Sequence, residues 1–135
     1  MIGKQYLITA MIMGGLGIAL SAFFRLKLGW PDAKFPILEA VLGADAAPDG
    51  LLDSNWYLGL VTLHGTIMVF FVLTGGLSGT FSNLLIPLQV GARDMASGLL
   101  NMIAYWLFFL SSLLMAASLF IETGPLWQVG QFIHL

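Results

Sequence analysis

Cysteine is absent from this sequence, and charged residues are scarce. Without cysteine the chain can form neither disulfides nor thiolate metal sites. Only 9% of the 135 residues are charged, the net charge is −2 and no basic tract occurs, which argues against nucleic acid as a partner. Hydrophobic residues are abundant instead, at 59%, and the mean hydropathy is +0.93. A soluble domain of this size would need more charge to cover its surface, so the composition predicts an integral membrane protein.

Three long uncharged stretches predict an all-α membrane fold with three transmembrane helices. The first helix is expected over residues 5–24, about the length that crosses a hydrocarbon core of roughly 30 Å. No small-residue cleavage signature accompanies Arg25, so we expect this helix to be retained rather than removed as a signal peptide. The second is expected over residues 56–86, ending near Pro87, and at about 46 Å it must tilt or project beyond the core. The third is expected over residues 95–121.

The segments outside these helices are more polar or too short to span a membrane. Residues 25–55 carry five of the seven acids and are expected to form an extramembrane loop. The tail, residues 126–135, is too short to cross a membrane. We therefore expect residues 1–135 to form a single membrane segment.

His64 is the one histidine inside a predicted span, and Gly65 follows it. An ionisable side chain at membrane depth is costly, so its presence indicates a function by default. Neutral imidazole is a standard axial ligand of haem iron, and a neighbouring glycine leaves room for a large flat group. The alternative is a histidine that is hydrogen-bonded to a neighbouring helix for packing. Arg25 likewise could reach to the interface or donate a hydrogen bond to a cofactor carbonyl or carboxylate.

Asp94 follows the second predicted span and lies between two asparagines in apolar surroundings. Asn83 precedes it by 11 residues, and Asn101 follows it by seven, about two helical turns. Because amides both donate and accept, they could line a row of waters behind a carboxylate mouth, as a proton path requires. The alternative is that Asp94 is a solvated turn residue and that the amides bond across helices for packing. Since about 28 Å of helix would separate His64 from Asn83, the two candidate sites would face opposite sides of the membrane.

The sequence from His64 to Phe109 resembles subunit I of the haem-copper oxygen reductases, the cytochrome c oxidase family. The resemblance rests on the runs HGTIMVFF, N-x-x-x-P-L-Q-x-G-A-R-D-M-A and L-N-x-x-x-Y-W-L. The first predicted helix, with ALSAFFRLKLGWP, is similar to the family helix that ends in an arginine. Because the family subunit has about twelve transmembrane helices, the resemblance implies that this chain corresponds to its N-terminal portion.

Carried over by position, the resemblance assigns roles to five residues. His64 would be one of two axial ligands of the low-spin haem, a haem A, and Arg25 would hydrogen-bond the formyl group of that haem. Asp94 matches the aspartate at the mouth of a proton pathway, and Asn83 and Asn101 match the asparagines just inside it. The resemblance also implies the cell (inner) membrane and a cytoplasmic N-terminus, which the distribution of Lys and Arg alone does not decide.

The resemblance further implies what the assembled complex does. It would be a terminal respiratory oxidase that reduces oxygen to water and pumps protons, with cytochrome c as the expected electron donor and a quinol as the alternative. Its other parts would be the remainder of subunit I together with subunits II and III. The high-spin haem and the copper would be bound by helices beyond this chain, so the isolated chain is expected not to be catalytic.

This sequence departs from the family pattern at several positions. Lys27 stands where many relatives have an acid that helps to bind a cation, and Ser97-Gly98 replaces a Pro-Arg pair, so both features are expected to be absent. His134 matches no family ligand and is expected to be a plain surface residue. Two other interpretations remain open: a non-catalytic small membrane subunit or assembly protein of an oxidase, and a homodimeric haem carrier in which each chain supplies one His64.

Overall fold

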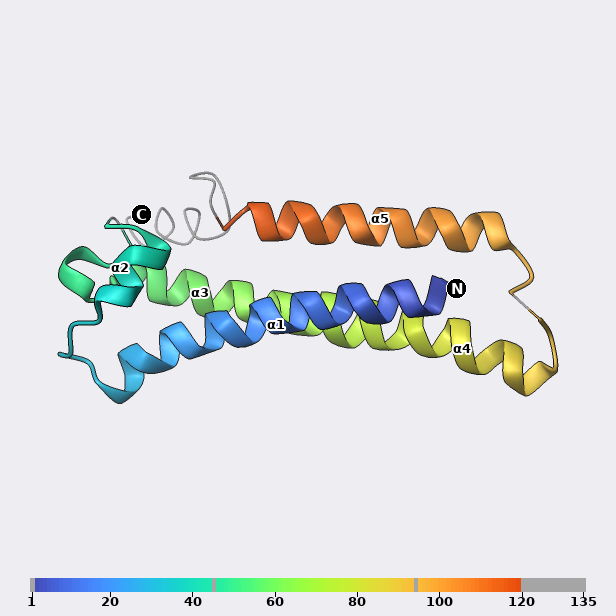
Figure 1. Ribbon diagram of the computed structural model, residues 1–135, viewed down its shortest axis with the longest axis horizontal. Helices are drawn as coiled ribbons and strands as arrows, with labels where there is room; N and C mark the ends of the chain where they lie inside the picture. Colours follow the sequence, from blue (N-terminus) through green and yellow to red (C-terminus); the bar gives the residue numbers. More distant parts are fainter. Residues whose placement is uncertain (1, 45, 94, 120–135) are drawn as a thin grey trace. The chain divides into compact units, whose positions relative to one another are not determined.

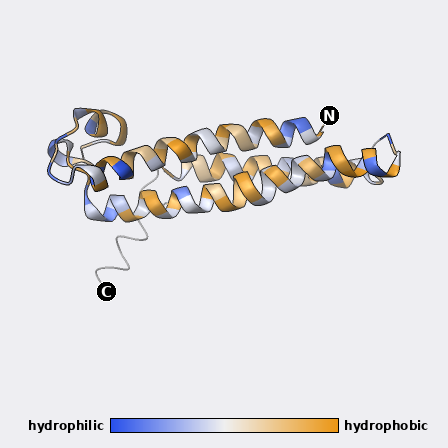
Figure 2. Ribbon diagram, turned by 90° about the horizontal axis from the view of Figure 1, so that it is seen from below, coloured by the Kyte–Doolittle hydropathy of each residue, from blue (hydrophilic) through white to orange (hydrophobic). Residues whose placement is uncertain are grey.

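The computed structural model describes residues 2–44, 46–93 and 95–119, and all its regular secondary structure in those ranges is helical. No strand occurs within those ranges. Three helices are long and apolar enough to cross a membrane: Ile2–Gly29, Ser54–Val90 and Gly98–Ala117. They are drawn in Figure 1, and Figure 2 shows apolar residues along their length. The predicted all-α membrane fold is therefore confirmed. Asp94, His134 and the tail of residues 126–135 lie outside the described residues.

Helix α1 (Ile2–Gly29) extends five residues beyond the end expected from the charge pattern. Arg25 and Lys27 lie inside it, because long basic side chains are good helix formers and can reach to water from a helix end. Trp30 then donates its backbone N–H to the Leu26 carbonyl at 3.0 Å, and Pro31 follows. A residue before proline disfavours helical backbone, so the proline marks the end of this helix and the charges do not.

The second long helix consists of three consecutive segments: α3 (Ser54–Thr66), η2 (Ile67–Ser78) and α4 (Gly79–Val90). The middle segment is a π-helix of 12 residues, a backbone geometry that is rare beyond a single turn. Nothing in the hydrophobic pattern of the sequence predicted this segment. It contains the adjacent pair Gly75 and Gly76, which leaves its backbone uncovered by side chains at those positions.

Both ends of the second long helix have a recognisable backbone or side-chain cap. At the start, the Asp53 carboxylate accepts a hydrogen bond from the Asn55 N–H at 2.9 Å. At the other end the helix passes through Pro87 rather than ending before it, and stops where Gly91 adopts a φ of 68°. The Ala92 N–H then donates to the Pro87 carbonyl at 2.9 Å, a Schellman-type closure that only a left-handed residue such as glycine allows easily.

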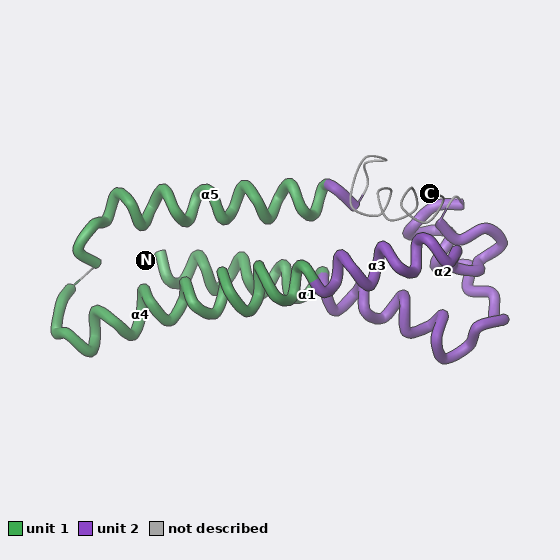
Figure 3. The backbone as a smooth tube through the Cα atoms, turned by 180° about the vertical axis from the view of Figure 1, so that it is seen from behind, with its two compact units in different colours: residues 1–16, 66–117 green, residues 17–65, 118–135 purple. Residues whose placement is uncertain are grey.

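The chain divides into two compact units, coloured separately in Figure 3. Unit 1 comprises residues 1–16 and 66–117, and unit 2 comprises residues 17–65 and 118–135. Within unit 1, the N-terminal part of α1 packs with η2, α4 and α5 (Gly98–Ala117). Within unit 2, the rest of α1 packs with α3 and the connecting segment between them.

Glycines of the second long helix allow close helix approach within unit 1. A methyl group on Gly76 would overlap the Ala10 side chain, and one on Gly79 would lie 2.6 Å from the Tyr6 ring. One on Gly75 would overlap the Phe108 ring of α5. Small residues at such positions let helix backbones come near one another in lipid, where van der Waals packing drives association.

The connecting segment of unit 2 is ordered rather than an open loop. It contains α2 (Pro36–Leu42) and the 3-10 turn η1 (Pro48–Gly50). The Phe35 N–H donates to the Gly50 carbonyl at 2.9 Å, and Gly50 has a φ of 76°, which suits glycine. Its interior is formed by four side chains that are 2% exposed or less: Leu38, Ala46, Ala47 and Leu52.

Candidate functional site

His64 lies in α3 and is held by the backbone of α1 within unit 2. Its Nδ1 is 2.7 Å from the Gly17 carbonyl oxygen. Because a carbonyl oxygen only accepts hydrogen bonds, Nδ1 must carry the hydrogen and donate it. In a neutral imidazole the other nitrogen, Nε2, then keeps its lone pair and is free to act as a ligand. Metal-bound histidines in proteins commonly have this arrangement, with the second ring nitrogen donating to a carbonyl or carboxylate.

The surroundings of His64 support the ring on one side and leave space beside it. The Phe24 ring meets the imidazole edge-on, with centroids 5.5 Å apart and planes at 67°. Leu60 and Leu63, on the same helix, are fully buried. A methyl group built on Gly65 would have no neighbouring atom within 4 Å. The imidazole is thus oriented by its hydrogen bond and its ring contact, and the helix surface at the next residue, Gly65, has no close neighbour.

Arg25 follows Phe24 directly in α1, and its side chain is exposed. Within the described ranges, no cluster of three metal-ligating side chains (His, Cys, Asp or Glu) occurs. A single histidine of fixed tautomer suits an axial position on a metal that is already held by a macrocycle, since haem iron takes such a ligand from the protein.

Asn83 and Asn101 come together in unit 1. The Asn101 side-chain amide donates a hydrogen bond to the Asn83 side-chain carbonyl oxygen, joining α5 to α4. The Asn83 amide nitrogen donates in turn to the Gly79 carbonyl at 2.8 Å. Both side chains are half-buried. Of the two alternatives weighed for these amides, lining a row of waters or bonding across helices for packing, a direct bond between α4 and α5 is the contact that packing alone would also produce.

A buried pair of hydroxyl groups also joins two helices of unit 1, and the sequence analysis missed it. Thr9 Oγ1 in α1 and the Tyr105 hydroxyl in α5 lie 3.2 Å apart. The Tyr6 ring contacts the Tyr105 ring edge-on, with centroids 5.2 Å apart. A signal was available, because Tyr105 follows Asn101 by four residues and therefore shares its face of the helix.

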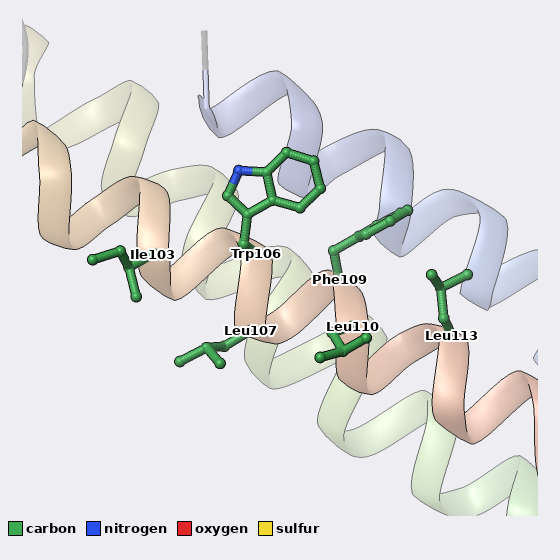
Figure 4. A pocket seen from close by; sticks show the side chains of 6 residues that line it. All are labelled: Ile103, Trp106, Leu107, Phe109, Leu110 and Leu113. Atoms are coloured by element: carbon green, nitrogen blue, oxygen red, sulfur yellow. The ribbon is translucent and has the colours of Figure 1, made fainter.

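A shallow groove on the outside of α5 has a purely apolar lining (Figure 4). The side chains that line it are Ile103, Trp106, Leu107, Phe109, Leu110 and Leu113. None of them can donate or accept a proton in catalysis, and Trp106 and Leu107 are more than half exposed. Such a surface suits lipid chains or another apolar helix, so we assign it no chemistry.

Comparison with protein families identifies the group to which this sequence belongs. Residues 1–133 match the family described as Cytochrome C and Quinol oxidase polypeptide I. The chain belongs to this family. The resemblance based on the segment from His64 to Phe109 is thereby confirmed, and a multi-pass membrane protein follows from the family together with the three long apolar helices.

Individual relatives agree with the family assignment. The chain is 39% identical over 124 residues to the alternative cytochrome c oxidase subunit 1 of Bradyrhizobium diazoefficiens, an alignment covering 92% of this chain and 18% of that protein. It is 32% identical to the cytochrome c oxidase subunit 1 of Cereibacter sphaeroides, covering 91% and 24% respectively. It is 36% identical to the heme-copper oxidase subunit I+III of Aeropyrum pernix, covering 91% and 13%. No solved structure matches the chain significantly.

The chain therefore spans between about an eighth and a quarter of the length of these relatives. This coverage agrees with the expectation that it corresponds to a portion of such a subunit. The individual roles of His64, Arg25, Asp94, Asn83 and Asn101 stay predictions, since neither the fold nor the family match assigns them.

Proposed function

We propose that this chain is part of the catalytic subunit of a terminal respiratory oxidase that reduces oxygen to water and pumps protons. Within it, His64 supplies one axial ligand of the low-spin haem. The observation that supports this most directly is the hydrogen bond from His64 Nδ1 to the Gly17 carbonyl at 2.7 Å. In a neutral imidazole the other nitrogen, Nε2, then carries the lone pair that binding to haem iron requires.

The residues around His64 fit a haem. The space beside Gly65 would let a flat macrocycle approach α3, and the Phe24 ring contacts the imidazole edge-on. Arg25, exposed and adjacent to Phe24, would donate hydrogen bonds to the formyl group of a haem A. When bound, a low-spin haem carries electrons through its iron. The second axial ligand, like the high-spin haem and copper, would come from parts of the subunit outside this chain.

The proposed proton path begins at Asp94 and passes Asn83 and Asn101. An acid at the mouth would gather protons from water, and the amides behind it can each donate and accept hydrogen bonds. The hydrogen bond between Asn101 and Asn83 supports a constriction of the proposed proton path at these two residues. Waters would have to pass beside or between two amides that already bond to each other. Opening that bond would admit a water chain, and closing it would interrupt one.

The proposed partners are the remainder of subunit I, subunits II and III, and the lipid of the cell membrane, with the N-terminus on the cytoplasmic side. The name of the Aeropyrum pernix relative joins subunits I and III in one protein, which supports subunit III as a neighbour. The family description names both cytochrome c and quinol, and the Bradyrhizobium and Cereibacter relatives are named for cytochrome c. We therefore propose cytochrome c as the electron donor.

The test is the His64→Ala variant of the assembled oxidase. Removing the imidazole should abolish the visible absorption of the low-spin haem, because alanine offers no lone pair to the iron. Oxygen consumption should fall to background with it. The measurement is a reduced-minus-oxidised spectrum normalised to the amount of assembled complex.

A matched control uses the other histidine of the chain. His134→Ala removes the same side chain at a position expected to be surface, and it should leave the spectrum unchanged. If the His64→Ala complex assembles and retains the low-spin spectrum, the ligand role of His64 is wrong.

A further inference from the structure

We infer that Tyr105 is a positioning residue for the Asn83–Asn101 pair and that it acts through its buried contact with Thr9. The inference rests on the proposed proton path and adds to it the element that sets the amide spacing. Tyr105 would touch neither the transferred proton nor a cofactor. Its part is to keep α5 in the position at which the Asn101 amide meets Asn83.

The hydroxyl contact joins α1 to α5 within unit 1. Thr9 and Tyr105 are 6% and 8% exposed, so both side chains of this polar pair are buried. Their oxygens lie 3.2 Å apart across α1 and α5. A buried hydroxyl that loses its partner keeps the full cost of having left water, so each side chain depends on the other to stay in place.

From Tyr105 a series of contacts leads back to the asparagines. The Tyr6 ring lies edge-on to Tyr105 at 5.2 Å and fills the space next to Gly79, where an added methyl would be 2.6 Å from the ring. The carbonyl of that same Gly79 accepts the hydrogen bond of the Asn83 amide at 2.8 Å. Tyr6 therefore lies between the Tyr105 ring and the Gly79 backbone, whose carbonyl orients the Asn83 amide.

The series closes on α5 itself. Tyr105 lies four residues after Asn101, one turn away on the same face of the helix. Asn101 then bonds to Asn83 in α4. A closed set of contacts over three helices has little freedom, so a shift of α5 at Tyr105 must change the distance between the two amides.

The experiment removes each hydroxyl from the assembled oxidase. Tyr105→Phe deletes only the phenol oxygen, Thr9→Val replaces the hydroxyl by a methyl, and Thr9→Ser keeps the hydroxyl. We measure turnover per haem, protons pumped per electron, and the solvent deuterium isotope effect on turnover. A defect in folding alone would lower the yield of complex, but it would not change the isotope effect per haem.

Tyr105→Phe and Thr9→Val should each slow turnover about two- to tenfold, the range that corresponds to losing one hydrogen bond. They should also raise the isotope effect and lower the pumping ratio, because proton entry becomes slower. Thr9→Ser should behave like the unmodified enzyme. The double variant should be no worse than either single variant, since both remove the same contact.

The matched control is Ser111→Ala, which removes a hydroxyl from the same helix. Ser111 Oγ donates to the Leu107 carbonyl of its own helix at 2.8 Å and is exposed, so all three readouts should stay unchanged. A Tyr105→Phe enzyme with unchanged isotope effect and pumping overturns the inference, as does a Thr9→Val enzyme that equals Thr9→Ser. If Tyr105→Phe prevents assembly, the comparison of Thr9→Val with Thr9→Ser tests the inference instead, through the same three measurements.

Asn101→Ala separates this inference from the proposed path. If Asn101→Ala leaves turnover, pumping and the isotope effect unchanged, the path itself is wrong. If it changes them while the hydroxyl variants do not, the path stands and only the role of Tyr105 is refuted.

Discussion

The contact between η2 and α1 predicts that Gly76 tolerates no side chain. In Gly76→Ala, the new Cβ would overlap the Cβ of Ala10 and would lie 2.7 Å from the Phe71 carbonyl oxygen. Neither atom can rotate away, because the Ala10 Cβ is fixed to its backbone and the oxygen is itself backbone. The helices or the π-helical backbone must therefore move.

The expected cost follows from two opposing effects. Overpacking an interior by one methyl group typically costs about 1–3 kcal/mol. Replacing glycine by alanine within a helix recovers about 1 kcal/mol of backbone preference. Because the obstructing atoms are rigid, the overpacking term should lie near its upper end, and we expect a net loss of about 1–2 kcal/mol of unfolding free energy.

The assay is unfolding of the purified protein in mixed detergent micelles with increasing dodecyl sulfate, followed by helical circular dichroism. Gly15→Ala is the matched control, because a methyl there meets no atom within 4 Å, and it should be neutral or slightly stabilising. The double variant Ala10→Gly with Gly76→Ala should recover part of the loss, since one of the two obstructing atoms is gone. Gly76→Ala with unchanged stability, or a double variant without recovery, would refute the packing described here.

Two further changes test other parts of the chain. Asp94→Asn should leave both haems in the assembled oxidase but slow turnover and reduce the number of protons pumped per electron, because an amide cannot take up a proton at the mouth of the path; normal pumping in vesicles would rule out that role. Asp53→Ala removes the carboxylate that accepts a hydrogen bond from the Asn55 N–H at 2.9 Å, and it should lower the unfolding free energy by about 1 kcal/mol in the same detergent assay. Asp53→Asn keeps a side-chain acceptor and should cost less. Equal losses in the two variants would contradict the helix cap.

The three transmembrane helices were predictable because, in a chain with so little charge, a long apolar stretch indicates a membrane span. The ends of the helices were less so. Arg25 indicated where the lipid ends, but α1 continues to Gly29 since a helix does not need lipid to persist. Pro87 indicated a break, but a proline near a helix end removes only one hydrogen bond, and α4 continues to Val90.

The sequence predicted which residues belong to the candidate sites, but it did not predict which atoms those residues contact. His64 and Asn83 stood out because polar side chains are rare in apolar runs. The acceptor for His64 is the backbone of Gly17, 47 residues earlier, and a backbone carbonyl has no signature in a sequence. The π-helical segment could not be predicted either, because the same hydrophobic run is compatible with α-helical and with π-helical hydrogen bonding.

The use of a main-chain oxygen to orient His64 has a consequence for how this position tolerates change. Every amino acid carries the same carbonyl group, so substitution at position 17 leaves the acceptor in place wherever the new side chain fits. Most single substitutions of Gly17 should therefore leave the tautomer of the His64 imidazole unchanged. Only a change that displaces the α1 backbone itself, such as a proline introduced into the neighbouring turn, would remove the oxygen that accepts from Nδ1 and so selects this tautomer.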